Sequence, residues 1–160
     1  MATPYELKFS TRLSATTAEV WIWMTSFEGI SREMSPYLHM STPAGVKSLR
    51  SVPFTPGKRL FRSWITLFRI LPFDYSDLTI LSIEEGVGFV EQSPMGTMRS
   101  WRHERRIAPT ESGCSLSDTL TFEPRFAGPI SRWIVAAFFR HRHRQLARHL
   151  GGTEQAEARR

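Results

Sequence analysis

The stretch SWRHERRIAPTESGCSLSDTLTFEP, residues 100–124, decides the fold. Successive side chains of a strand point to opposite faces, and both halves of this stretch alternate in that way. The residues at every second position form a mostly apolar inward face: Trp101, His103, Arg105 and Ile107, then Cys114, Leu116, Asp118, Leu120 and Phe122. The residues between them are polar and suited to water. The pattern predicts two antiparallel strands, 98–107 and 115–123, joined through the turn-forming group 109–113.

Further strands are predicted on the N-terminal side of this hairpin. Short runs with strand character are separated by Pro72, by Glu85-Gly86 and by the group 94–96. We expect strands over 60–68, 75–83 and 88–92, preceded by a first strand over 5–13. Regular short strands with tight turns are typical of an antiparallel meander.

The segment between the first strand and the meander is predicted to be helical and then irregular. Thr16 or Thr17 can cap a helix over 18–25, and a second short helix over 27–34 ends near Pro36. Residues 36–57 contain four prolines and two glycines. This segment is therefore expected to be a loop, with one short strand near 46–50.

One long helix is predicted to close the chain, over 129–150. Pro129 suits its first turn and Gly151-Gly152 suits its end. The side expected to face the sheet contains Ile130, Trp133, Ile134, Ala137 and Phe138, then His141, Gln145 and His149. The fold class is therefore α+β, with a curved antiparallel sheet wrapped around a long C-terminal helix. One helix rarely fills such a concavity, so we expect a ligand-sized cavity between helix and sheet.

Length and composition agree with a single globular domain, predicted over 1–152 and followed by a polar tail over 153–160. The chain has 160 residues, of which 41% are hydrophobic and 12% aromatic, which excludes a disordered protein. The longest apolar run, 133–139, is too short to span a membrane. The N-terminus MATPYELKFS has no secretory pattern. Cys114 is the single cysteine, which excludes a disulfide framework and a cysteine-rich zinc site. We expect a cytoplasmic protein.

The formal charge of +6 is concentrated in one segment. Residues 1–123 contain 13 basic and 13 acidic side chains, whereas 124–153 contains six arginines and no acid. Nucleic-acid binding is not expected, because the arginines lack interleaved aromatic residues or a known module. Transient contact with an anionic membrane surface through Arg140, Arg144 and Arg148 is the better functional hypothesis, beside a merely solvated helix face.

Three motifs in chain order resemble those of the START-like, or SRPBCC, superfamily. This group has the helix-grip fold and includes polyketide cyclase/dehydrases, coenzyme Q-binding proteins and the birch-pollen allergen. The resemblance is closest to bacterial ligand-binding members of unassigned function. The first motif is FVEQSPMGTMRSWRHERRI, with Phe89, Glu91, Met95-Gly96-Thr97, Trp101 and His103. The second, CSLSDTLTF, contributes Leu116, Asp118 and Phe122, and the third, AFFRHRHRQL, contributes Phe138, Phe139, Arg140 and His141. Arg105 stands where the family pattern has a second histidine.

His103 and Asp118 are polar residues on an otherwise apolar face, which makes them the main site candidates. If Ile107 pairs with Cys114, His103 lies directly opposite Asp118. Asp118 then orients a histidine that contacts a ligand or acts as a general base. The alternative is a satisfied polar pair within the core. Arg105 is a further catalytic candidate, and Arg62 could meet an anionic ligand group or lie on the outer face.

The leading functional prediction is the binding of a small hydrophobic molecule such as a lipid, a quinone or a polyketide-like compound. The expected contacts are Arg62, Trp64, Trp101, His103, Leu116, Asp118, Leu120, Trp133, Ala137 and Phe138. The first alternative is a cyclase or dehydratase with His103 as general base and Arg62 or Arg105 stabilising an enolate. The second is an interaction protein that docks through its basic C-terminal helix. No cofactor is expected, and the spacing of His141, His143 and His149 does not suit a metal site.

Overall fold

The computed structural model describes residues 3–155 of the chain. Its helices are α1 (Thr17–Thr25), α2 (Phe27–Met34) and α3 (Gly128–Leu150), with a short 3-10 turn at Leu49–Ser51. Its strands are β1 (Tyr5–Leu13), β2 (Leu38–Met40), β3 (Arg59–Leu67), β4 (Leu71–Glu84), β5 (Gly88–Gln92), β6 (Met98–Thr110), β7 (Gly113–Pro124) and β8 (Gly152–Gln155).

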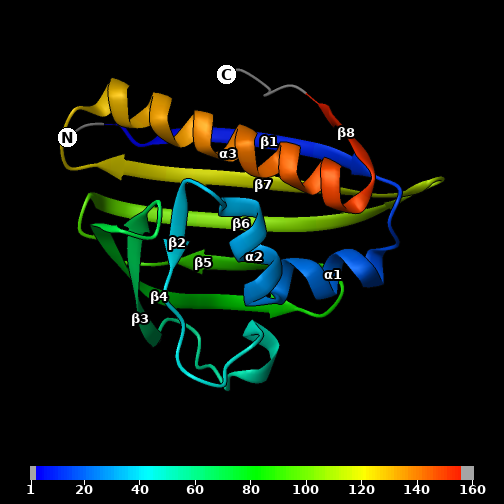
Figure 1. Ribbon diagram of the computed structural model, residues 1–160, viewed down its shortest axis with the longest axis horizontal. Helices are drawn as coiled ribbons and strands as arrows, with labels where there is room; N and C mark the ends of the chain where they lie inside the picture. Colours follow the sequence, from blue (N-terminus) through cyan, green and yellow to red (C-terminus); the bar gives the residue numbers. More distant parts are fainter. Residues whose placement is uncertain (1–2, 156–160) are drawn as a thin grey trace.

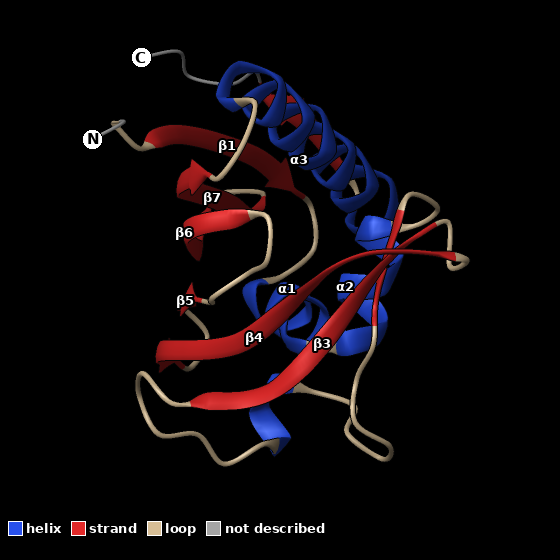
Figure 2. Cartoon of the chain, turned by 90° about the vertical axis from the view of Figure 1, so that its left-hand side faces the viewer, coloured by secondary structure: helices blue, strands red, loops and turns tan. Residues whose placement is uncertain are grey.

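The strands form one antiparallel sheet in the order β2-β3-β4-β5-β6-β7-β1-β8. The meander β3 to β7 follows chain order, and β1 joins it beside β7. Figure 1 shows α3 running across this sheet in front of β1 and β7. Figure 2 shows the sheet bent around the three helices. The predicted α+β helix-grip architecture is confirmed.

The two short helices form where the sequence provides caps. Thr16 and Glu19 form a reciprocal capping box at the start of α1, and Ser26 caps α2 by accepting a hydrogen bond from the Gly29 amide. The α2 helix ends at Ser35, which precedes Pro36. Both predicted helices are confirmed, and their position places α2 against α3.

Two local predictions are wrong. The short strand is β2, at Leu38–Met40, whereas residues 46–50 contain a single bridge and the start of the 3-10 turn. Pro72 does not separate two strands but lies within β4, next to a register shift in the pairing with β3, where a missing amide donor is tolerated. The turn itself lies earlier, at Phe68 and Arg69, which have φ values of 49° and 64°.

The C-terminal end of the chain contains one strand that was not predicted. Residues Gly152–Gln155, in the expected polar tail, form β8 beside β1. Gly151 links α3 to this strand with a φ of 67°, a conformation that suits glycine. Residues 156–160 of the predicted tail lie outside the described residues.

The α3 helix presents a different side to the sheet than its hydrophobic pattern predicts. Ile130, Trp133 and Ile134 are 62%, 66% and 52% exposed. The side that is buried contains Val135, Ala136, Phe139, His141, Arg142, His143 and Leu146. Because Arg142 and His143 meet buried carboxylates, the charged side of the helix can face the interior. The prediction failed because it placed the most apolar side of the helix inward, whereas of that side His141 is buried and Ile130, Trp133 and Ile134 are exposed.

Two apolar clusters form the core. One joins α1 to the sheet around Leu13, Trp21, Met24, Leu116 and Leu146. The other joins the N-terminal half of α3 to β1 and β7 through Leu7, Phe9, Leu120, Phe122 and Phe139. Within residues 3–155, no helix combines the length and the apolar character needed to cross a membrane.

Candidate functional site

The hairpin of β6 and β7 positions the two residues that the sequence singled out. Arg105 lies opposite Asp118, and His103 lies opposite Leu120. The predicted pairing of Ile107 with Cys114 is therefore wrong by two positions, because the turn is a tight one at Glu111-Ser112 between Thr110 and Gly113. A shift of two residues keeps every side chain on its face. The predicted inward face of both strands is confirmed.

Arg105 is the centre of a buried polar network and has no exposed surface. Its guanidinium donates to Asp118 through Nε and Nη2, each at 2.8 Å. It also donates to Glu33 of α2, from Nη1 at 2.9 Å and from Nη2 at 3.0 Å. Two planar carboxylates thus share one planar guanidinium, which is the pairing that arginine geometry favours.

Glu33 connects the network to α1 and α3. Its carboxylate accepts two hydrogen bonds from Arg142 of α3, from Nε at 3.0 Å and from Nη2 at 2.8 Å. The indole N–H of Trp23, on α1, donates to the same carboxylate at 3.0 Å. A side chain from the short α2 helix therefore holds the long helix, α1 and the sheet together.

Two histidines complete the shell around Asp118. The Nε2 atom of His103 lies 2.6 Å from Oδ1 of Asp118, and Nε2 of His143 lies 2.8 Å from Oδ2. The second ring nitrogen of His143 is 2.7 Å from the hydroxyl of Thr11 on β1. The Nδ1 atom of His103 lies 3.6 Å from a carboxylate oxygen of Glu91 on β5. Both nitrogens of each ring therefore have a polar neighbour.

The charged side chains of this network are buried and stabilise one another electrostatically. Burial raises the pKa of the Asp118 carboxyl, but Arg105 and His103 outweigh burial and hold that pKa well below its usual range. Burial likewise raises the pKa of Glu33, and Arg105 and Arg142 bring it below the ordinary value. Two carboxylates balance two guanidinium groups, so the core array of four side chains is neutral.

The charge on Asp118 also acts on His103. Burial lowers the pKa of the His103 imidazole, but the charge and hydrogen bond of Asp118, with help from Glu91, raise it above the ordinary value. His103 is only 3% exposed. A general base needs a nitrogen that can reach a substrate proton, and both nitrogens of this ring are engaged inside the network. The geometry therefore fits the satisfied polar pair that the sequence left as the alternative.

The predicted ligand contacts on β3 lie on the convex face of the sheet. Arg62 donates to Asp77 at 2.7 and 2.8 Å and lies over the ring of Tyr75, with its guanidinium carbon 4.4 Å from the ring centroid. Trp64 lies opposite Tyr75 and is 56% exposed. The inward residues of β3 are instead Phe61, Ser63 and Ile65. Of the two directions left open for Arg62, the structure has the outer one, and the expected interior position of Trp64 is not observed, because the equally apolar alternate face of β3 is the one that packs.

The remaining predicted contacts divide among core, surface and an intermediate layer. Leu116 and Leu120 are fully buried in the two apolar clusters, and Trp133 lies on the surface. Ala137 is half-buried. Trp101 and Phe138 are partly buried and pack on the second cluster, where their rings lie 6.2 and 5.9 Å from the ring of Phe139. The aromatic pair Trp101 and Phe138 forms the edge of the apolar interior.

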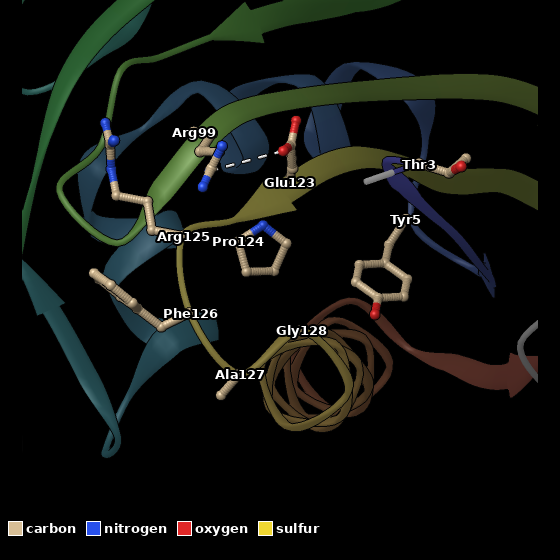
Figure 3. A pocket seen from close by; sticks show the side chains of 9 residues that line it. All are labelled: Thr3, Tyr5, Arg99, Glu123, Pro124, Arg125, Phe126, Ala127 and Gly128. Atoms are coloured by element: carbon tan, nitrogen blue, oxygen red, sulfur yellow. Dashed lines mark ion pairs between the residues drawn. The ribbon is translucent and has the colours of Figure 1, made fainter. Parts of the chain in front are cut away.

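A hollow of about 280 Å³ lies outside this interior, at the N-terminal end of α3. Figure 3 shows its lining, which comes from the start of β1 and the residues before it, the start of β6, the end of β7 and the loop into α3. The lining residues are Thr3, Tyr5, Arg99, Glu123, Pro124, Arg125, Phe126, Ala127 and Gly128. None of the predicted ligand contacts belongs to this hollow.

The histidines of α3 have mainly interior roles. Nε2 of His141 lies 2.7 Å from the carbonyl oxygen of Ser35, and His143 belongs to the network. His149 is exposed, and its ring lies tilted against that of Trp23 with the centroids 5.1 Å apart. Among residues 3–155, no group of histidine, cysteine and carboxylate side chains is arranged to hold a metal ion.

The network partners Glu33, Arg142, His143 and Thr11 were not predicted. A signal for Arg142 was available. Val135, Phe139, Arg142 and Leu146 follow the spacing of one helix face, so the apolar residues on either side of Arg142 marked it as inward-facing. Glu33 precedes the buried Met34 on a short helix, and periodicity alone does not identify it as the partner of an arginine far along the chain.

Comparison with solved structures identifies the fold. A protein of Chromobacterium violaceum matches with a TM-score of 0.68 at 13% identity, covering 92% of this chain and 98% of that one. A START superfamily protein from Mycobacterium smegmatis matches with a TM-score of 0.65 at 10% identity, covering 93% and 97%. The protein Ara h 8.0201 matches with a TM-score of 0.64 at 9% identity, covering 92% and 97%. The chain has the START-like, or SRPBCC, fold.

Sequence comparison assigns the family. No curated relative matches the chain. The sequence model described as Domain of unknown function (DUF8410) matches residues 11–150. This range includes the network and nearly the whole of the sheet and helices, so the chain belongs to the DUF8410 family.

Proposed function

We propose that this member of the DUF8410 family binds a small hydrophobic molecule, of the lipid, quinone or polyketide-like class, between the sheet and the N-terminal half of α3. The observation that carries the proposal is the partly buried aromatic pair Trp101 and Phe138. Both side chains pack against the second apolar cluster and keep part of their own surface exposed. Apolar surface of this kind binds apolar molecules because contact removes it from water.

The fold supports the same function. The sequence motifs resemble those of coenzyme Q-binding proteins and polyketide cyclases, and the fold is START-like. In a fold where a single long helix packs on a curved sheet, the space between the helix and the sheet can accept a ligand. Here the C-terminal half of α3 is occupied by the polar network, which leaves the N-terminal half as the place for an apolar ligand.

A polar atom on the inward face is available to orient such a ligand. Ser76 on β4 lies opposite Ser63 and is 2% exposed. Its hydroxyl has no hydrogen-bond partner among the described residues. Apolar sites usually contain a few polar groups that fix the orientation of the ligand. A compound with one carbonyl or hydroxyl end therefore suits this interior better than a pure hydrocarbon.

The test is the binding of an environment-sensitive apolar dye, with matched tryptophan variants. We expect Trp101→Ala to weaken dye binding by roughly tenfold, since it removes a large part of the apolar contact. Trp64→Ala removes an exposed tryptophan from the outer face and should leave dye affinity unchanged. Ala137→Trp adds bulk at a half-buried position of α3 and should compete with the dye without disturbing the core.

Two further measurements keep the test decisive. Melting curves of all three variants show whether a loss of dye binding reflects unfolding, and native mass spectrometry of freshly purified protein shows whether a small molecule is retained. Equal dye affinity in the parent, Trp101→Ala and Ala137→Trp would refute the proposed site. If Trp64→Ala lost as much dye affinity as Trp101→Ala, the dye would be bound on the outer face, and this result would also refute the proposed site.

A further inference from the structure

Several large apolar side chains at the N-terminal end of α3 have more than half of their surface exposed. Phe126 in the preceding loop is 76% exposed, and Ile130, Trp133 and Ile134 are 62%, 66% and 52% exposed. The three helical residues are spaced by three and four positions, so they share one face. We name these four residues the α3 apolar patch. A contiguous apolar patch on a surface marks an interaction site.

The loop that leads into this patch is held in an unusual conformation. Ala127 has a φ of 47°, in the left-handed region that disfavours residues with a side chain, and it provides no side-chain cap for the helix. Such strained positions cluster at functional sites. The conformation at Ala127 links the end of β7 to α3, with Phe126 exposed to solvent directly before it.

The surroundings of the α3 apolar patch are basic. Arg125 precedes the patch and is exposed, and it lines the hollow together with Arg99 (Figure 3). Glu123 is the acidic residue in that lining, and it pairs with Arg99 at 3.8 Å. From residue 124 to residue 153 the chain has six arginines and no acid. Arg142 is turned inward to Glu33, whereas Arg125 is exposed directly before the patch and Arg144 and Arg148 are exposed toward the C-terminal end of the helix.

We propose that the α3 apolar patch inserts into the surface of an anionic membrane. A helix face with tryptophan and isoleucine beside arginine side chains is the composition that binds at the lipid–water boundary. The arginines of the hollow then lie level with the lipid phosphates, where each cation adds attraction to a negative surface. This contact replaces the predicted one through Arg140, Arg144 and Arg148 as the main anchor, because those arginines add charge without apolar insertion. It goes beyond ligand binding and stands independently of it.

The experiment measures co-sedimentation with vesicles of phosphatidylcholine alone and of phosphatidylcholine and phosphatidylglycerol in equal parts. The parent should bind the mixed vesicles and should bind them less as salt increases. The double variant Ile130→Ser, Trp133→Ser should lose roughly tenfold or more in affinity, because two inserted apolar side chains are removed. Ile22→Ser changes an isoleucine that is 59% exposed on α1 and is the matched control.

Tryptophan quenching by brominated lipid locates the contact. Trp133→Phe should lose most of the quenching seen in the parent, whereas Trp64→Phe should retain it. The proposal is overturned if the parent fails to bind anionic vesicles, or if the double variant binds as well as the parent. It is also overturned if the parent is a dimer by sedimentation equilibrium and the double variant a monomer that still binds vesicles, because the patch is then an interface between copies. Dye binding is measured without vesicles, so its failure is separate from failure of this proposal.

Discussion

The two halves of α3 pack against the same sheet in opposite ways. The C-terminal half turns Arg142 and His143 inward, onto carboxylates that are themselves buried. The N-terminal half packs Phe139 into an apolar cluster and leaves Ile130 and Trp133 in solvent. We call the C-terminal half, with its buried ion pairs, the closed half. We call the N-terminal half, with its exposed apolar side chains, the open half.

Because of this difference, we expect the closed half of α3 to contribute mainly to stability and the open half mainly to binding. In the closed half, the buried Arg142 and His143 each have a carboxylate partner at hydrogen-bond distance, so a ligand could enter there only by displacing an ion pair, which is costly in a buried site. In the open half, apolar surface remains to be covered and no ion pair has to break. Variants of the closed half should therefore change the free energy of unfolding, and variants of the open half should change binding.

The largest effect is expected from Arg105→Met. The substitution leaves Glu33 and Asp118 buried without their shared partner, and breaking a buried ion pair in this way costs about 3–5 kcal/mol. The measurement is the free energy of unfolding from urea titration. Arg106→Met is the control, because this neighbour points outward, pairs with Glu104 and is half-exposed, and its loss should cost less than about 1 kcal/mol. Equal costs for the two variants would show that the network is no more important than surface pairs.

A smaller loss is expected from His103→Asn. Asp118 keeps its bonds to Arg105 and His143 but loses the one to His103. Leaving one buried group short of a partner costs roughly 1–3 kcal/mol. Asp118→Asn should cost at least as much, and the double variant should cost less than the sum of the two single variants, since the two residues interact directly. Strict additivity would mean that this hydrogen bond contributes nothing to folding.

The free energy of unfolding should be highest over a middle range of pH and should fall on the acid and alkaline sides for different reasons. The pKa values of Glu33 and Asp118 are lowered, so their stabilisation is complete above about pH 4.3 and is lost as the pH falls through the lowered values. The pKa of His103 is raised, so its stabilisation is complete below about pH 6.5 and is lost as the pH rises through the raised value. One group changes the slope by at most about 1.4 kcal/mol per pH unit.

Mutation of His103 tests which group causes the decline in the free energy of unfolding on the alkaline side. In His103→Asn the decline in the free energy of unfolding above about pH 6.5 should flatten, while the acid flank remains. Asp77→Asn removes a partly buried carboxylate outside the network. Its pKa is also lowered, chiefly by the Arg62 hydrogen bond, and its removal should alter the acid flank only slightly. A decline above pH 6.5 that persists in His103→Asn would assign it to another group.

Most of the fold could be predicted from the sequence because local signals determine it. Strand alternation in 100–124, the caps at Thr16 and Ser26 and the glycine after α3 each act within a few residues. Even the wrong register of β6 and β7 left the inward faces correct, because a shift of two positions conserves them. The strand at Leu38–Met40 was missed because its three residues carry too little alternation.

The site was harder to predict because it depends on partners far apart in the chain. His103 and Asp118 were found as polar residues on an apolar face, but Glu33 is 72 positions from Arg105 and 109 from Arg142. No local pattern reveals such a pairing. The predicted orientation of α3 was wrong for the same reason, because an arginine side chain faces the interior only where a buried carboxylate pairs with it. Arg62 was undecided for a related reason, because both faces of β3 are equally apolar.

The smallest effect on folding is expected from Trp133→Ser, which tests the open half directly. Trp133 is 66% exposed and lies on the same helix as Phe139, which is 1% exposed. Because most of the Trp133 side chain is exposed, removing it should change the free energy of unfolding by less than about 0.5 kcal/mol. Phe139→Ala is the matched variant and should cost about 3–5 kcal/mol, because it opens a cavity in the second cluster. Urea titration of both variants gives the comparison. A cost above about 2 kcal/mol for Trp133→Ser would mean that this side chain is covered in solution, so that the N-terminal half of α3 is closed like the C-terminal half. The contrast between the two halves would then fail.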